Sequence, residues 1–399
     1  MQSCGRVFCP ILARAEAILK VGRRISKDNF VGSSPTVFIG HNFYPKLYVG
    51  ILSPPEHRDD AWIYDAPHCW VEQNLTIPTI LDYRSSLINS RFRADIKGKN
   101  RFLDISREVG MASKPVDIEI ELKEKPKFRL KTDAYLAPTG PNARLKKAKL
   151  VENPRVDSRI EKVVSDIDLV ANQALVYLYK HGFNENFLTK LLSTGNLGIK
   201  ANRKLVPTRW SITATDDSIS KYLLGKVRDY DFCGYEAYFG GHLGNYFIVL
   251  FFPDVWSYEL FEMYSPGAEW NLSNQYKYMT DYESYYGRKG YAENCGGGYY
   301  AARFAVLEKL FRKKRQASVL VFRFITGEYA VPLGVWVVRE AVRKTLRNKP
   351  IEFSSEDLML QYARKLVKKK FDYKLDILLR RSVILKKSKN QMRLRDFLG

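Results

Sequence analysis

Cysteine and histidine are both scarce in this chain, with five of each among 399 residues. An odd and small number of cysteines in a chain of this length argues against a disulfide framework. The sequence also lacks a Ser-His-Asp order, a paired-carboxylate motif and an H-E-x-x-H motif. It therefore identifies no catalytic residue by itself and leaves open whether the chain is an enzyme.

Long apolar runs are also missing. The longest covers residues 246–252, far short of the roughly 20 residues that a membrane-spanning helix needs. Arg6, Arg14 and Glu16 interrupt the first apolar stretch, so no signal-peptide pattern opens the sequence. We therefore expect a cytoplasmic protein with no membrane partner.

Acidic residues are outnumbered, with 43 Asp and Glu against 65 Lys and Arg, a net charge of +22. Most of the excess lies in residues 311–399, which contain 23 basic and 8 acidic residues. The highly charged surface of a thermophile protein would pair its charges more evenly. The imbalance instead predicts a polyanionic partner, and we expect DNA and a nucleoid-associated location.

The apolar content of 45% and the aromatic content of 13% predict a folded globular body. Strand-like and helix-like segments follow one another without strict alternation, which favours an α+β fold, with mixed α/β as the alternative. One long helix is expected over 157–181, and Ser354-Ser355 is expected to cap a basic helix over 356–369.

Composition divides the chain into four expected parts. These are a cysteine-bearing segment (1–30) with a helix over 11–21, an N-terminal α+β region (31–137), a C-terminal α+β region (155–385) and a flexible tail (386–399). The stretch 137–154, with three prolines and a lysine cluster, is the expected boundary, or alternatively a long surface loop.

The last nine residues contain Gln391, Leu394, Phe397 and Leu398 in the spacing Q-x-x-h-x-x-a-a. One helical turn places the three apolar side chains on one side. The spacing resembles the peptide that docks on the sliding clamp PCNA, which makes PCNA an expected partner. Alternatively, Leu394 and Phe397 pack on the parent domain as part of a terminal helix.

Cys4 and Cys9 are candidate thiolate ligands for zinc. A structural zinc site needs a full set of Cys or His ligands, and the local set is incomplete. The more distant candidates are His57, His68 and Cys69. Two reduced cysteines on a loop are the alternative, so no cofactor is certain and zinc stays open.

Two other segments could contact nucleic acid or a nucleotide. In the first, Thr208, Arg209 and Trp210 precede Asp216 and Asp217, and an arginine beside a tryptophan suits phosphate binding and base stacking. The alternative is that the aspartates cap a helix and Arg209 pairs with one of them. The second segment places Gly297 in a glycine-rich turn before a helix that carries Arg303, where backbone amides could hold phosphate. A purely structural turn is equally compatible.

Several segments together resemble one family, the archaeal Nre DNA-repair proteins. They are GSSPTVFIG at 32–40, YPKLYVG at 44–50, VPTRWSIT at 206–213, GGYYAAR at 297–303 and PLGVW at 332–336. The resemblance implies a role in DNA-damage repair and PCNA binding through the C-terminal peptide. The family often opens with a four-cysteine, zinc-finger-like cluster, of which this chain matches only the second half.

Three hypotheses about function follow. The leading one is a DNA-binding repair factor recruited to PCNA through its C-terminal peptide. The second is an enzyme that acts on DNA or a nucleotide in a cleft around Arg209, Asp216 and Gly297. The third is a clamp-associated scaffold without chemistry.

Overall fold

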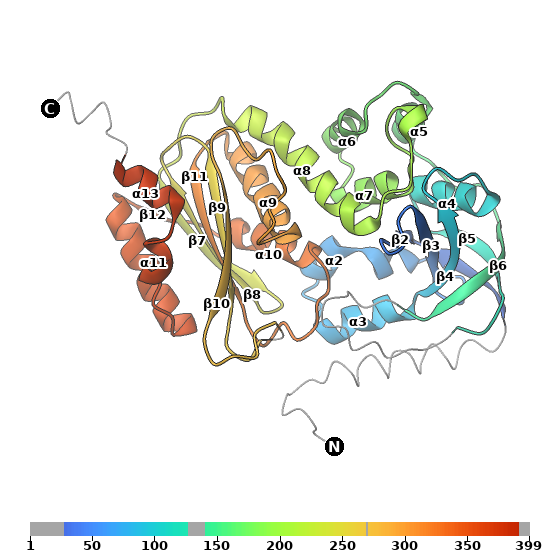
Figure 1. Cartoon of the computed structure of the whole chain (residues 1–399), viewed down its shortest axis with the longest axis horizontal. Coiled ribbons are helices and arrows are strands. Elements are labelled where there is room, and N and C mark those ends of the chain that lie inside the picture. Colours follow the sequence, from blue (N-terminus) through green and yellow to red (C-terminus); the bar gives the residue numbers. More distant parts are fainter. Residues whose placement is uncertain (1–27, 127–139, 269, 391–399) are drawn as a thin grey trace, which may run out of the picture. The chain divides into compact units, whose positions relative to one another are not determined.

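A computed structural model of the chain describes residues 28–126, 140–268 and 270–390. They form helices and two six-stranded mixed sheets, which confirms the predicted α+β class (Figure 1). The chain divides into two compact units. The first contains the residues up to Ile219 and Val331–Gly334, and the second contains Ser220–Ala330 and Val335–Gly399. Within the described ranges, none of the helices combines the length and the apolar character that a membrane crossing requires.

The first unit is built on a sheet with the strand order β1-β5-β6-β4-β3-β2. Its strands are β1 (Asn29–Ser34), β2 (Thr36–Ile39), β3 (Lys46–Ser53), β4 (Ile88–Asp95), β5 (Val116–Leu122) and β6 (Asn142–Leu150). Its helices are α2 (Pro67–Glu72), α3 (Ile77–Ser86), α4 (Arg101–Met111), α5 (Ser158–Ser165), α6 (Ala171–Lys180) and α7 (Glu185–Ser193), with 3-10 turns at Ala61–Asp65 and Lys200–Asn202. Helix α8 (Thr208–Val227) begins in this unit and ends in the second.

Alternation along β5 gives this sheet two different faces. Ile118 and Ile120 are buried in the core with Leu103 and Val109 of α4, whereas Glu119 between the isoleucines is exposed on the opposite face. We call the face opposite the α4 core the outer face of the first sheet. Asn100 fixes the start of α4, because its Oδ1 accepts a hydrogen bond from the backbone N–H of Leu103 at 3.0 Å.

The second unit has a sheet with the order β10-β9-β11-β8-β7-β12, in which only β9 and β11 run parallel. Its strands are β7 (Tyr235–His242), β8 (Asn245–Phe252), β9 (Ser257–Tyr264), β10 (Lys277–Glu283), β11 (Ser318–Ile325) and β12 (Ile351–Phe353). Its helices are α9 (Gly297–Lys313), α10 (Trp336–Arg347), α11 (Glu356–Phe371), α12 (Asp376–Leu379) and α13 (Val383–Asn390).

Helices cover both faces of this second sheet. Helices α9 and α10 lie on one face and α11 and α13 on the other (Figure 1). The central strand β11 is accordingly buried along its whole length. Because the α11 side of the sheet is filled by residues such as Phe322, Ala363 and Val367, the charged side chains of α11 are left on the solvent side.

The structure differs from the sequence-based expectations for residues 157–181 and for the domain boundary. The single helix predicted over 157–181 is wrong, since α5 and α6 are separate. Oδ1 of Asp166 accepts the backbone N–H groups of Asp168 at 3.1 Å and Leu169 at 3.0 Å, which turns the chain between them. The expected boundary at 137–154 contains β6, which pairs with β4 and β5, and the compact units divide within α8 instead.

Candidate nucleic-acid interface

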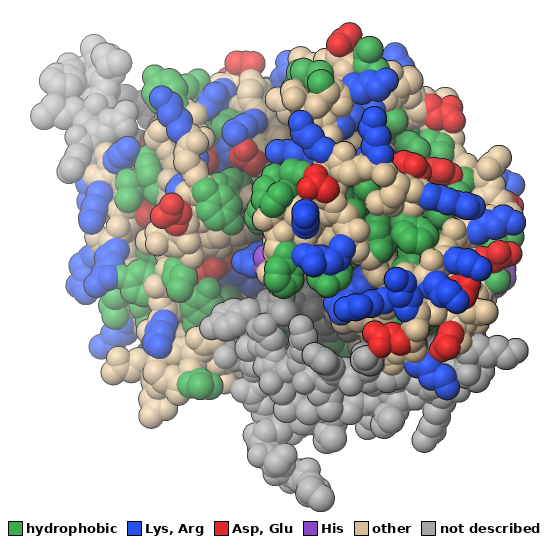
Figure 2. All heavy atoms as spheres, turned by 45° about the vertical axis from the view of Figure 1, so that its right-hand side comes forward, with side chains coloured by type: hydrophobic (Ala, Val, Ile, Leu, Met, Phe, Trp, Pro, Cys, Tyr) green, Lys and Arg blue, Asp and Glu red, His purple; other side chains and the backbone are tan. Residues whose placement is uncertain are grey.

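The C-terminal layer of the second unit is strongly basic. Residues 361–390 contain Arg364, Lys365, Lys368, Lys369, Lys370, Lys374, Arg380, Arg381, Lys386, Lys387 and Lys389. The acidic residues of this segment are Asp372 and Asp376. We call the segment the basic layer. Lys and Arg side chains line the left edge of Figure 2, the side on which Figure 1 shows α11 and α13.

The amphipathic pattern of α11 determines which side chains of this layer reach solvent. Met359, Ala363 and Val367 are buried at helical spacing, so Lys365 and Lys369 are exposed on the opposite side. Ser355 accepts a hydrogen bond from the N–H of Leu358 at 3.3 Å, which confirms the predicted cap. Because the apolar face of α11 is buried, its lysines lie on the face that is exposed to solvent.

Few of these cations are neutralised by carboxylates. Arg364 Nε lies 2.7 Å from Asp376 Oδ1, and Lys368 pairs with Asp372. Among the described residues, Lys365, Lys369 and Lys370 have no carboxylate partner. Exposed and uncompensated lysines provide point charges suited to phosphate groups.

A buried carboxylate attaches α13 to the sheet. Glu259 on β9 is 1% exposed, and its Oε2 accepts a hydrogen bond from the hydroxyl of Ser382 at 2.6 Å. The backbone N–H groups of Val383 and Ile384 donate to the same carboxylate at 3.0 and 3.2 Å. Burial raises the pKa of Glu259, while these hydrogen bonds act in the opposite direction. Helix α13, which ends directly before Gln391, is thus fixed at its first turn.

Replacing Glu259 by alanine should loosen this attachment. Two helix N–H groups and one hydroxyl would lose their acceptor, which should lower the free energy of unfolding by about 2 kcal/mol. Hydrogen exchange of the α13 amides should accelerate more than that of α9. Glu352→Ala, which removes an exposed carboxylate on β12, serves as the control. Equal exchange in both variants would show that Glu259 does not hold α13.

Three of the predicted site residues lie together on the first unit. Thr208 opens α8, and its Oγ1 accepts a hydrogen bond from the N–H of Ile39 at 2.9 Å. The ring of Trp210 is 48% exposed and lies 5.5 Å from the ring of Tyr44, centroid to centroid. Arg209 between them is exposed and has no carboxylate partner in the described part of the chain.

Asp216 and Asp217 are interior residues of α8, so the expectation that they cap a helix is wrong. The helix starts earlier, where the carbonyl of Pro207 accepts the N–H of Ser211 at 2.9 Å. Asp216 is 1% exposed. The alternative in which Arg209 pairs with one of the aspartates is also wrong, since both carboxylates have other partners and Arg209 has none among the described residues.

Gly297 and Arg303 belong to the second unit. Gly297 is the first residue of α9 and is half-buried. Arg303 is 1% exposed, and its Nε donates to Glu283 Oε1 at 2.8 Å. This burial favours a structural role for Arg303 over contact with a phosphate. Since Arg209 and Gly297 lie in different units, a cleft shared by both remains a prediction.

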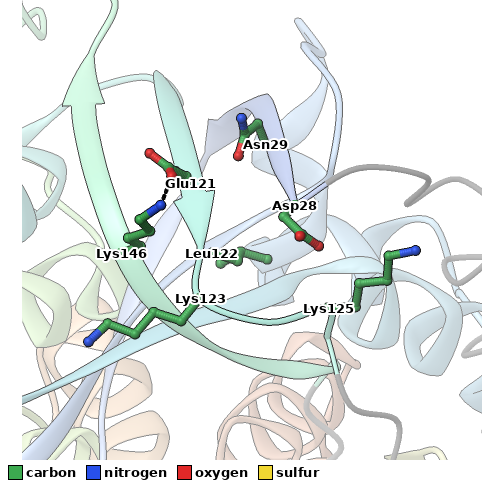
Figure 3. A pocket seen from close by; sticks show the side chains of 7 residues that line it. All are labelled: Asp28, Asn29, Glu121, Leu122, Lys123, Lys125 and Lys146. Carbon is green, nitrogen blue, oxygen red and sulfur yellow. Dashed lines mark ion pairs between the residues drawn. The ribbon is translucent and has the colours of Figure 1, made fainter.

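A cavity of about 960 Å³ lies at the end of β5, beside β6, and includes Lys123, Lys125 and Lys146 in its lining. Lys146 Nζ is 2.5 Å from Glu121 Oε1, and this hydrogen bond lowers the pKa of Glu121. Figure 3 shows Lys123 and Lys125 extending in different directions, away from Glu121. The three amino groups do not converge, so the cavity is not built as a cradle for a single phosphate.

Comparison with known proteins identifies the family. A model described as Archaeal Nre, N-terminal matches residues 3–271, and one described as Archaeal Nre, C-terminal matches residues 283–397. This chain belongs to the archaeal Nre family. It is 39% identical to DNA repair protein NreA of Haloferax volcanii over 78% of this chain and 76% of that protein. It is 37% identical to DNA repair protein NreB of Archaeoglobus fulgidus, over 91% of this chain and 90% of that protein.

A further relative, DNA repair protein NreA of Archaeoglobus fulgidus, is 36% identical over 92% of both chains. No solved structure matches the chain. The segments at 32–40, 44–50 and 206–213, on which the resemblance to the Nre family rested, come together in the first unit. The contacts of Ile39 with Thr208 and of Tyr44 with Trp210 join them.

The sequence did not single out three residues that lie near Tyr44 and Trp210 on the first unit. Tyr48 of β3 and Arg91 and Arg93 of β4 lie beside the loop that joins β2 to β3, with cation–π distances between 4.9 and 5.5 Å from Tyr48. The available signal was the alternation of β4, which places two arginines on one side of a strand.

The zinc expectation for this Nre chain stays a prediction, because Cys4 and Cys9 lie outside the described residues. Of the distant candidates, His57 Nδ1 lies 2.8 Å from Asp117 Oδ2, and His68 Nε2 lies 3.1 Å from Glu185 Oε1. Cys69 is half-buried on α2, and burial raises the pKa of its thiol.

Proposed function

We propose that this Nre chain is a DNA-repair factor that binds DNA phosphates through the basic layer and is recruited to PCNA through its C-terminal peptide. The observation that carries the proposal is the position of the basic layer. The uncompensated lysines of α11 belong to the same layer as α13, whose lysines directly precede the residues with clamp-peptide spacing. Its relatives' names, DNA repair proteins NreA and NreB, support the repair role.

The two elements support each other physically. PCNA is the clamp that encircles DNA, so a peptide bound to it confines the chain near the duplex. Tethering raises the local concentration of the basic layer around DNA without any additional DNA contact. Weak phosphate contacts by lysines are therefore sufficient once the tail is bound. The carboxylate of Glu259 holds α13, so the basic layer and the start of the tail are attached to the same sheet.

Replacing Lys365, Lys369 and Lys370 together by glutamine should weaken duplex binding and reduce its salt dependence. Each phosphate contact contributes a slope of about −0.9 in a plot of log affinity against log salt, so three contacts contribute about −2.7. Fluorescence anisotropy with a labelled duplex at several salt concentrations measures this slope.

The matched control replaces the same three lysines by arginine and keeps the charge. It should retain affinity and slope within experimental error. A triple glutamine variant with the wild-type slope would show that the basic layer does not contact phosphates. A flat salt profile in the wild type would instead favour a scaffold without DNA contacts.

A further inference from the structure

Three exposed aromatic rings lie together on the first unit. Phe43 is 67% exposed, Tyr44 is 44% exposed and Trp210 is 48% exposed. Tyr44 and Trp210 contact each other, and Phe43 and Tyr44 are neighbours in the loop between β2 and β3. We call these three rings the aromatic platform. A contiguous group of exposed rings is typical of an interaction site.

The platform is held by the backbone around it. The N–H of Lys46 donates to the carbonyl of Phe43 at 2.8 Å, which closes the loop that carries two of the rings. The hydrogen bond from Ile39 to Thr208 ties the end of β2 to the start of α8, which carries the third ring. Phe43 has a φ of 68°, a left-handed conformation that is unfavourable for a large side chain. Such strain is typical of positions that serve a function other than stability.

Cationic groups surround the platform. The guanidinium of Arg93 lies 5.6 Å from the ring of Phe43 and 5.5 Å from that of Tyr48, and Arg91 lies 4.9 Å from Tyr48. Arg209 is exposed directly beside Trp210.

Arg91, Arg93 and Arg209 have no carboxylate partner in the described part of the chain. Other arginines of the first unit do pair with carboxylates, such as Arg58 with Asp60 and Arg84 with Asp65. The Nε of Arg91 is buried without a hydrogen-bond acceptor, so it is a donor that lacks a partner within the chain. The platform therefore combines exposed rings with guanidinium groups that have no carboxylate partner among the described residues.

A ligand of this surface must cover the exposed rings and also supply anions for the arginines. An apolar protein partner would cover the rings but would bury unpaired guanidinium groups, which is costly. Duplex DNA would satisfy the arginines through its phosphates but keeps its bases stacked inside the helix. An unpaired strand offers both groups, because its bases stack on aromatic faces while its phosphates meet the arginines. The N-terminus of α8 adds positive potential at the same place.

We propose that the aromatic platform, with Arg93 and Arg209, is a binding site for the unpaired bases of single-stranded DNA. This inference rests on the proposed DNA-binding function and adds the form of DNA that is recognised. Bases stack on the exposed faces of Phe43 and Trp210. The backbone of the strand lies along the unpaired arginines. The site is separate from the basic layer, which recognises phosphates regardless of strandedness.

Alanine at position 210 or 43 should weaken single-strand binding. For each of Trp210→Ala and Phe43→Ala, we expect the Kd of the full-length protein for an oligothymidylate of about 20 nucleotides to rise about 10-fold, and the Kd for a duplex of the same length to change less than about twofold. Fluorescence anisotropy measures both. The matched control is Trp62→Ala, which removes another tryptophan of the first unit that is also 48% exposed, and it should leave both affinities unchanged.

A second readout guards against misfolding of the alanine variants. Trp210→Phe keeps a ring for stacking, so it should retain single-strand affinity within about threefold. The quenching of tryptophan fluorescence by oligothymidylate should nevertheless disappear in this variant and persist in Trp62→Phe. Quenching that survives in Trp210→Phe would overturn the inference.

The outcomes separate this inference from the proposed function. If Trp210→Ala behaves like Trp62→Ala while the duplex binding of the wild type still depends on Lys365, Lys369 and Lys370, the platform is not a base-binding site and the proposed function stands. If the wild type binds neither form of DNA, both fail. Tighter binding of an oligouridylate than of an oligothymidylate would overturn the assignment to DNA.

Discussion

The double variant Phe397→Ala and Leu398→Ala should lose PCNA binding by at least about 100-fold, since buried apolar anchors carry most of the binding energy in an interface of this kind. Both side chains belong to the spacing that resembles a clamp-binding peptide, together with Gln391 and Leu394. Isothermal titration calorimetry with purified clamp measures the loss. The same variant should bind duplex DNA with nearly unchanged affinity, because the basic layer is intact.

The control must change the tail without changing the motif. Met392→Ala and Arg395→Ala replace residues at the variable positions of the spacing. These variants should retain clamp binding within about threefold, because non-anchor positions of an interface contribute little. If the double anchor variant binds the clamp as well as these controls do, the peptide assignment is wrong.

The alternative hypothesis makes a different prediction for the same variants. If Leu394 and Phe397 pack on the parent domain, the loss of the Phe397 side chain in the double variant should lower thermal stability, since a buried apolar side chain contributes a few kcal/mol. A docking peptide that is free in the unbound protein should leave stability unchanged. Thermal unfolding of the double variant therefore distinguishes a peptide for a partner from a helix of the core.

Some strands could be predicted from the sequence because their residues follow a simple pattern, either alternating apolar and polar or apolar nearly throughout. The alternation of Val116–Leu122 and the mostly apolar character of Ser318–Ile325 predict strands from the sequence alone, and the structure has β5 and β11 over those residues. Strand β6 escaped detection for a physical reason. A register shift between Glu121 and Leu122 of its partner strand interrupts its period of two, and lysines dominate its outer face.

The beginning of α8 was hidden by residues that usually lie outside helices. The segment from Thr208 contains threonine, serine and aspartate at close spacing, and such residues favour caps and turns in isolation. Tertiary contacts override this preference, since Ser211 and Asp216 are both buried within the helix. The error mattered for function, because it moved the expected helix start away from Arg209 and Trp210.

Of the two candidate sites, only the basic layer could be located from the sequence. A charge excess is a property of composition, so the basic layer could be located from the sequence alone. The aromatic platform could not, because its rings come from two segments that are distant in the chain. Arg209 and Trp210 were recognisable as a pair suited to nucleic acid, but only folding shows that Tyr44 lies against Trp210.

The glycine-rich start of α9 packs closely on the second sheet. Beneath it lies a buried ion pair, in which Arg323 Nη1 donates to Glu262 Oε1 at 2.5 Å with both side chains less than 10% exposed. Arg323 also donates from Nε and Nη2 to Asn245 Oδ1, at 3.0 and 2.6 Å. A Cβ atom added at Gly298 would lie 2.4 Å from Glu262 Oε1. Glycine is therefore required at position 298 by close packing of the helix on the ion pair.

Breaking this pair from one side should be strongly destabilising. Glu262→Leu leaves the guanidinium of Arg323 buried without its carboxylate, and we expect the free energy of unfolding to fall by about 3–5 kcal/mol. Denaturant unfolding followed by far-ultraviolet circular dichroism measures the change. Glu352→Leu is the control, because the side chain of Glu352 is exposed on β12 of the same sheet.

The double variant Glu262→Leu and Arg323→Met decides what the ion pair contributes. Replacing both charges by apolar side chains removes the desolvation cost of each, so the double variant should regain at least about half of the stability lost in Glu262→Leu. Full recovery is not expected, since Asn245 Oδ1 would lose the two donors from Arg323. A double variant less stable than Glu262→Leu would mean that Arg323 supports the fold mainly through Asn245. In that case the bonds from Arg323 to Asn245 of β8, and not the ion pair, would stabilise the segment under the start of α9.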